Sequence, residues 1–193
     1  MTSHDVVTST GIDLTMMYAA HRAFRRDLDR LAGPLDERRR RDRWQLFIRQ
    51  LHAHHRAEDV SLWPRLQERC RDDAGALEIL AAMESEHGVI DPLLARADRV
   101  LDALQSHLVA HLEHEERAAL PLVRERLSQA DWRGFMSEVR RANGLKGARE
   151  FFPWLLEGAS AAEADAVCRP LPAPLRILIR RRWVPAYERK HPW

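Results

Sequence analysis

The chain has 193 residues, 45% of them hydrophobic, and its 31 basic and 29 acidic residues leave a net charge of only +2. This length fits a single domain with a sizeable core. The small net charge gives no general case for nucleic-acid binding, and no apolar stretch is long enough to suggest a membrane span. The first fourteen residues lack a basic region followed by an apolar run, so we expect no secretory signal and a cytoplasmic protein.

The first predicted helix runs from near Asp13 to Ala32 and carries a histidine on its apolar face. Apolar residues that recur at alternating steps of three and four mark the buried face of a helix. Here that stripe is Leu14, Met17, His21, Phe24, Leu28 and Leu31. We therefore expect His21 in the core. Tyr18 could point to the same place and supply a phenolate or a redox-active hydroxyl, or it could be a boundary aromatic.

A long second helix is predicted from about Asp36 to Arg71, with a kink at Pro64. Its stripe consists of Trp44, Phe47, Leu51, His54, Glu58 and Leu62. The stripe selects His54 as the inward histidine. We expect His55, together with His52 and His114, to line solvated flanks.

The third helix is predicted to start near Ala74 and to continue past Pro92, with Leu80, Met83, His87, Ile90 and Leu94 as its stripe. No glycine, proline or turn cluster follows before Pro121. Either the chain reverses tightly at Ala97 to Val100, with Asp98 capping the next helix, or one straight helix holds His87 and His111 on the order of 36 Å apart. In the second case the next segment would complete another subunit's site in a domain-swapped homodimer.

The fourth segment repeats the pattern of the second. His111-x-x-x-Glu115 is followed by a proline six residues after the glutamate, as is His54-x-x-x-Glu58. Its stripe consists of Leu101, Leu104, Leu108, His111, Glu115, Ala118 and Leu122. His107 lies off this stripe and is a spare candidate ligand.

The chain contains four histidine–acid pairs at a spacing of four residues: His54/Glu58, His55/Asp59, His87/Asp91 and His111/Glu115. The apolar stripes select the first and the last. Imidazoles and carboxylates are costly to bury unless they are paired or bind a metal. Residues four apart on a helix can offer one cation both a nitrogen and an oxygen. Two facing helices could thus hold two metals with bridging carboxylates.

The remaining segment predicts further helices. One is expected around Trp132 to Val139 and another at "REFFPWLLEG", and Ser160 with Glu163 forms a capping-box pattern. We expect residues 1–128 to form the bundle and residues 129–193 to form a helical extension that packs on it and screens the site. The basic, amphipathic C-terminal segment could alternatively dock on a membrane or a partner.

The blocks "HHRAEDVSLWP" and "HLEHEERAALP", with His21 and His87, resemble the hemerythrin-like proteins that carry the HHE cation-binding domain. The resemblance spans roughly Leu14 to Arg126. It implies an all-α, antiparallel four-helix bundle around a non-haem di-iron site, with additional C-terminal helices here. It assigns six ligands: His21, His54, Glu58, His87, His111 and Glu115.

The chain departs from the oxygen-carrying members at Asp91, where they have a second histidine. Asp91 could ligate the metal, accept a hydrogen bond from a ligand histidine, or cap a helix restart before Pro92. With a fifth imidazole missing, we expect an oxygen donor to favour ferric iron and to discourage reversible oxygen carriage.

The resemblance therefore implies two iron ions that bind dioxygen, peroxide or nitric oxide, with catalase-like turnover or oxygen sensing preferred to transport. Manganese and zinc are alternative metals. A di-iron oxygenase acting on a small organic substrate is an alternative function, and an apolar cavity reaching the metals would favour it. An iron-sensing or redox-sensing interaction protein is another. Beyond the metal ligands the sequence identifies no catalytic residue, and Tyr18 is the one further candidate.

Overall fold

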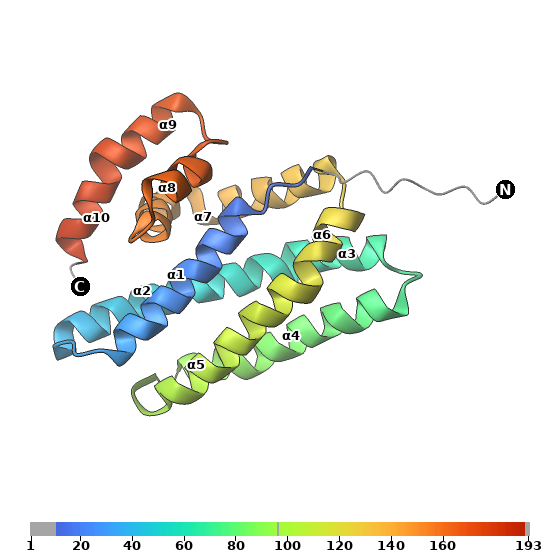
Figure 1. Cartoon of the computed structure of the whole chain (residues 1–193), viewed down its shortest axis with the longest axis horizontal. Coiled ribbons are helices and arrows are strands. Elements are labelled where there is room, and N and C mark those ends of the chain that lie inside the picture. Colours follow the sequence, from blue (N-terminus) through green and yellow to red (C-terminus); the bar gives the residue numbers. More distant parts are fainter. Residues whose placement is uncertain (1–10, 96, 192–193) are drawn as a thin grey trace.

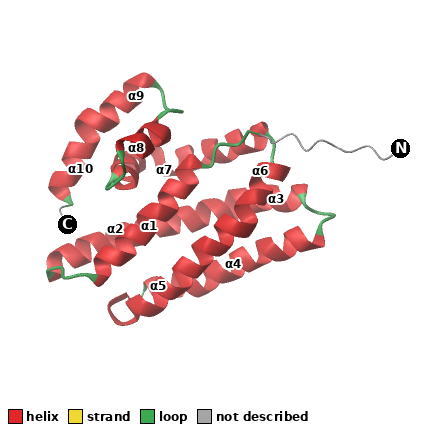
Figure 2. Cartoon of the chain, viewed as in Figure 1, coloured by secondary structure: helices red, strands yellow, loops and turns green. Residues whose placement is uncertain are grey.

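The computed structural model describes residues 11–95 and 97–191, and every regular element in that part of the chain is a helix (Figures 1 and 2). The α-helices are α1 (Thr15–Ala32), α2 (Glu37–Ala57), α3 (Trp63–Arg69), α4 (Ala74–Leu94), α5 (Ala97–His114), α6 (Leu120–Arg126), α7 (Gln129–Leu156), α8 (Ala161–Cys168), α9 (Ala173–Leu178) and α10 (Val184–Lys190). Three π-helical turns connect some of them: η1 (Glu58–Leu62), η2 (Glu115–Ala119) and η3 (Ile179–Trp183). The predicted all-α class is confirmed.

Four helices form a closed bundle in which each packs on two others. Helix α1 lies against α2 and α5, and α4 lies against the same two helices (Figure 1). The predicted stripes face inward, so that Phe24, Leu28, Phe47, Leu51 and Leu108 are all fully buried. The predicted four-helix bundle is therefore confirmed, and its centre is where the four stripes meet.

Each His-x-x-x-Glu motif runs directly into a π-helical turn. The amide N–H of Trp63 donates to the carbonyl of Glu58, and that of Leu120 donates to the carbonyl of Glu115, each five residues back. A proline follows in both cases, Pro64 and Pro121. A proline ring clashes with the carbonyl four residues earlier in an α-helix, and widening the helix by one residue relieves the crowding.

The π-turn also shifts the buried face by one residue. The sequence predicted Ala118 and Leu122 as core positions after Glu115, but both are only partly buried. Ala119 and Val123, each one residue later, are fully buried instead. That part of the predicted stripe was wrong because the prediction assumed α-helical spacing, whereas the π-helical turn contains one additional residue.

The chain reverses between α4 and α5. Helix α4 ends at Leu94 and α5 already begins at Ala97, so the turn comes earlier than the predicted Ala97 to Val100, and the single straight helix was wrong. The side chain of Asp98, the predicted cap, is outside the part that the structure describes. Both halves of the site lie in one chain, so no domain swap is needed to assemble them. A homodimer stays a prediction.

The extension shares the hydrophobic core of the bundle. Trp154, Leu155, Val167 and Tyr187 belong to the same buried cluster as residues of α1, α2 and α5. The fifth and sixth predicted helices are the two halves of α7, which break at Gly144 (φ 57°, ψ −170°), a conformation that glycine tolerates. The predicted capping box at Ser160 and Glu163 is present. The division of the chain into two units at residue 128 stays a prediction.

A buried arginine ties the extension to α2. The guanidinium of Arg43 donates to both carboxylate oxygens of Glu157, each at 3.0 Å, to the Tyr187 hydroxyl at 3.0 Å and to the His191 carbonyl. These partners lie directly after α7 and in or just beyond α10, so one side chain ties the middle and the C-terminal part of the extension to α2.

No helix in residues 11–95 or 97–191 combines the length and the apolar character needed to cross a membrane.

The Arg43 contacts predict a stability effect. Arg43→Ala removes a buried cation, although Arg26 and Arg30 remain 3.7 and 3.6 Å from the Glu157 carboxylate. We expect the free energy of unfolding in urea to fall by about 2 kcal/mol. Arg41→Ala, two residues away and exposed, should change it by less than about 0.5 kcal/mol. Equal effects of the two substitutions would contradict the structural role given to Arg43.

Candidate metal centre

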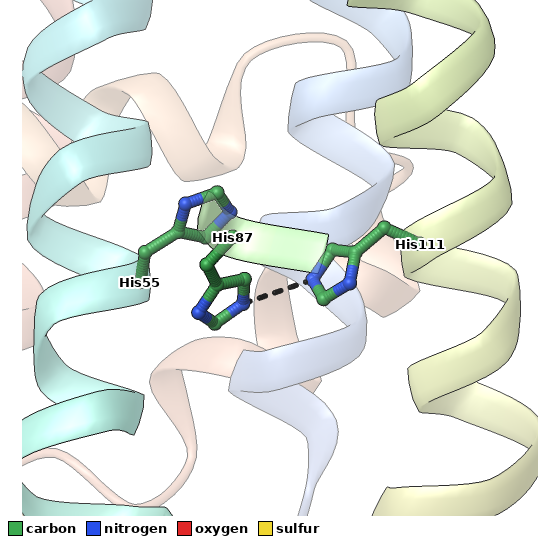
Figure 3. A group of neighbouring side chains, drawn as sticks. All are labelled: His55, His87 and His111. Atoms are coloured by element: carbon green, nitrogen blue, oxygen red, sulfur yellow. Dashed lines mark hydrogen bonds between the residues drawn. The ribbon is translucent and has the colours of Figure 1, made fainter. Parts of the chain in front are cut away.

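Seven buried or nearly buried side chains converge at the centre of the bundle in two groups. One group is His55, His87 and His111, from α2, α4 and α5, and is shown in Figure 3. The other is His21, His54, Glu58 and Glu115, from α1, α2 and the first residues of η1 and η2. In each group the candidate ligand atoms all lie within 4.8 Å of one another. The six residues assigned from the sequence are all present, and His55 joins them.

The two glutamates lie between the groups. Glu58 places one oxygen 3.2 Å from Nε2 of His54 and the other 3.6 Å from Nε2 of His87. Glu115 places Oε2 3.2 Å from Nε2 of His21 and 3.9 Å from Nε2 of His111. Each carboxylate therefore faces one imidazole of each group, as a ligand shared by two cations would.

Four of the five imidazoles donate their Nδ1–H to a carboxylate outside the two groups. His21 pairs with Glu116 at 2.9 Å, His55 with Asp91 at 2.8 Å, His87 with Asp59 at 2.7 Å and His111 with Glu86 at 2.7 Å. Such a bond fixes the tautomer, because the proton sits on Nδ1 and the lone pair on Nε2. All four lone pairs then point toward the centre.

The converging nitrogen and oxygen atoms could bind cations, but most of them form no hydrogen bonds with one another. Nε2 of His21, His54 and His55, and both oxygens of Glu58 and Glu115, are buried without a hydrogen-bond partner. Nε2 of His87 and Nε2 of His111 are 3.1 Å apart (dashed line in Figure 3), although each carries a lone pair once Nδ1 holds the proton. Buried polar atoms are rarely left unsatisfied. Divalent or trivalent metal ions bound by nitrogen and oxygen would satisfy all of them.

Without metal, bound protons would partly compensate for the burial of these carboxylate and imidazole groups. Burial raises the pKa of Glu58 well above its usual value, and the nearby carboxylates of Glu115 and Asp59 raise it further. Burial lowers the pKa of His54 well below its usual value. Burial also opposes a charge on His21, but Glu115 and Glu116 outweigh it and raise its pKa to about 9. Metal binding would therefore displace protons from Glu58 and His21.

His55 corrects the expectation that it lines a solvated flank. It is 1% exposed, and its ring stacks on that of His87 at a centroid distance of 3.9 Å. A helix in a four-helix bundle faces two neighbours, so its inward arc is wider than one stripe. His54 lies against His21 of α1, and His55 lies against His87 of α4. The assumption of a single stripe forced a choice between them, and the fifth imidazole is not missing.

Asp91 accepts a hydrogen bond from His55 and lies outside both groups of candidate ligand atoms. Of the three roles considered for it, the structure favours orienting a histidine. The sequence did carry a signal for this arrangement. His55 and Asp59 on one segment, and His87 and Asp91 on the other, are spaced four apart, and in the structure they exchange partners across α2 and α4.

The other candidates lie away from the centre. Tyr18 is 37% exposed, and its ring centroid lies 6.0 Å from the Arg124 guanidinium, so of its two interpretations the structure favours the boundary aromatic. His52 and His107 are exposed. His114 is partly buried and pairs with Glu86 at 2.7 Å. The acidic residues Glu86, Asp59 and Glu116, which orient ligand histidines, were not identified from the sequence.

An apolar cavity of about 90 Å³ reaches the centre beside His54 and Glu58. Helix α7 contributes several aromatic and aliphatic side chains to its wall, and α1 contributes others. No residue of the group His55, His87 and His111 lines it. The cavity is therefore adjacent to only one of the two candidate metal positions.

A comparison with known protein families identifies the domain that holds the site. The model described as the hemerythrin HHE cation binding domain matches residues 13–123. This range contains all seven converging side chains and ends before α7. No curated protein and no solved structure matches the chain.

The position of His55 predicts a difference between neighbouring histidines. His55→Ala removes a donor from the group with His87 and His111, so we expect the variant to lose about half of its bound metal. His52→Ala, on the same helix but exposed, should bind as much as the unmodified protein. Elemental analysis after zinc loading and desalting measures both. Equal metal content in the two variants would remove His55 from the proposed ligands.

The carboxylates that accept hydrogen bonds from the imidazoles should affect metal affinity, but less than the candidate ligands do. Asp59→Asn and Asp91→Asn keep the side-chain shape but lower the negative charge that orients His87 and His55. We expect each to weaken metal affinity by about 10- to 100-fold, measured by competition with a chromophoric chelator. Asp72→Asn, whose side chain is 94% exposed, serves as the control. Affinities indistinguishable from that control would contradict the orienting role.

Proposed function

This chain belongs to the hemerythrin family, and from that premise we propose that it is a non-haem di-iron protein that binds and reacts with dioxygen or hydrogen peroxide. One observation carries the proposal: seven side chains in two adjoining groups, with two glutamates placed between the groups. Imidazole and carboxylate together suit iron among the available metals. Zinc and manganese remain alternative occupants that elemental analysis distinguishes.

In this proposal the residues of the site have two roles, namely binding the metal ions and orienting the histidines. His21 and His54 would hold one ion, His55, His87 and His111 the other, and Glu58 and Glu115 would bridge them. The carboxylates of Asp59, Asp91, Glu86 and Glu116 keep the imidazoles oriented. Bound iron would supply the redox chemistry with dioxygen or peroxide. The ligand numbers are unequal, two imidazoles against three, so the His21 and His54 position has the greater capacity for an added small ligand.

The presence of His55 changes one argument made from the sequence. The expected lack of a fifth imidazole was the reason for preferring reaction to reversible carriage, and that reason no longer holds. The apolar cavity now supports the preference for reaction, because it gives small uncharged molecules a path to the position with fewer imidazoles. It also favours the second candidate function, oxidation of a small organic substrate.

Iron loading under anaerobic conditions tests the proposal. We expect about two iron ions per chain, a change in the optical spectrum on addition of dioxygen or peroxide, and consumption of the oxidant. Glu58→Ala and Glu115→Ala should each lose iron, because each removes a ligand shared by both positions. Glu113→Ala, an exposed neighbour on α5, should retain it.

Two results would contradict the proposal. An iron content near zero in the unmodified protein would remove its basis. An oxygen complex that forms and releases dioxygen through many cycles without oxidation of the iron would show a carrier rather than a protein that reacts.

A further inference from the structure

We propose that the cavity beside His54 and Glu58 binds a compact, uncharged and mainly apolar molecule, at most about the size of a benzene ring. The inference rests on the proposed function, because it names the class of organic molecule that would lie next to the metal there. It concerns a part of the chain that the family match does not reach, since residues 13–123 end before α7.

The wall of the cavity is mainly apolar and comes from α1, α2 and α7. Helix α7 contributes Trp132, Phe135 and Met136, and α1 contributes Met17 and Phe24. Trp154, in the second half of α7, closes it against Phe24 at a ring centroid distance of 5.0 Å. Apolar walls of this kind with few polar groups are typical of small-molecule sites. The break at Gly144 lets both halves of α7 contribute to one cavity.

The charges around the cavity exclude ionic ligands. Among the described residues that line the cavity, Glu58 is the only one with a carboxylate, and none is a lysine or an arginine. In the metal-free protein an anion would lose its hydration with no basic side chain in the wall to compensate. A cation would compete with the metal for Glu58. The two side-chain amides that line the wall already donate elsewhere, Gln50 to Glu150 at 3.4 Å and Asn143 to the Val139 carbonyl at 3.0 Å.

The volume sets the upper size. A rigid apolar cavity of about 150 Å³ holds benzene, and this one measures about 90 Å³. Three methionines, Met16, Met17 and Met136, line it, and methionine side chains adapt to irregular shapes at little cost. One ring therefore fits after a small adjustment, whereas two fused rings do not.

Fluorine NMR titrations of the full chain, as purified and after zinc loading, test the proposal. We expect fluorobenzene to bind saturably at one site. 1-Fluoronaphthalene should bind at least about tenfold more weakly, and 4-fluorobenzoate should do the same in the metal-free protein. Ala53→Leu fills the cavity from α2 and should weaken fluorobenzene binding by about tenfold or more. Ala110→Leu makes the same change at an exposed position on α5 and should alter it less than about twofold.

A second variant guards against misfolding of the first. Met136→Ala enlarges the cavity, so we expect it to admit 1-fluoronaphthalene with an affinity close to that of fluorobenzene in the unmodified protein. Absence of saturable fluorobenzene binding, or equal binding by the Ala53→Leu and Ala110→Leu variants, overturns the proposal. So does tighter binding of 4-fluorobenzoate than of fluorobenzene by the metal-free protein.

Metal substitution locates the ligand. Manganese is paramagnetic and zinc is not, so bound fluorobenzene should relax faster in the manganese-loaded protein than in the zinc-loaded one. Equal relaxation places the ligand away from the centre and overturns the proposal. Fluorobenzene binding by a chain that takes up no metal supports the cavity and overturns the metal function, whereas metal uptake without fluorobenzene binding overturns only the cavity.

Discussion

The structure depends on a group of buried polar side chains at the centre of the bundle, most of whose inward-facing atoms have no hydrogen-bond partner. Two glutamates and five imidazoles make up this group. Burial of this kind costs more free energy than a small domain can spare. Protons on His21 and Glu58 reduce the cost without metal, and cations would reduce it further. Metal binding would therefore be coupled to folding of the bundle.

The π-helical turns give two consecutive acidic residues different tasks. Glu58 and Glu115 each open a turn and face the centre, and the next residues, Asp59 and Glu116, accept hydrogen bonds from His87 and His21 on other helices. In each half of the bundle one short segment thus supplies a candidate ligand and orients another. The proline that follows helps to impose the turn, which explains why it stands at the same distance from both glutamates.

The C-terminal extension, which lies outside the family match, covers one side of the candidate metal centre. Arg43 and Trp154 bind it to the bundle, the latter through a 2.8 Å hydrogen bond from its indole N–H to Asp27. Because α7 is held in this position, its apolar side chains cover the His54 side of the centre and enclose the cavity there. The two candidate metal positions consequently differ in their surroundings as well as in their number of imidazoles.

The sequence by itself determined the helical class, the four inward stripes and six of the seven converging side chains, because buried positions on a helix recur with a fixed period. Tertiary structure decided the rest. The reversal after Leu94 carries no glycine or proline, so only the packing of α4 on α5 reveals it. The inward position of His55 could be predicted only if α4 were known to pack against α2. The hydrogen-bonded pairs His55–Asp91 and His87–Asp59 likewise connect different helices. The periodicity of a sequence shows which face of a helix is buried but not which helices pack against it. The site is complete only because particular helices are neighbours.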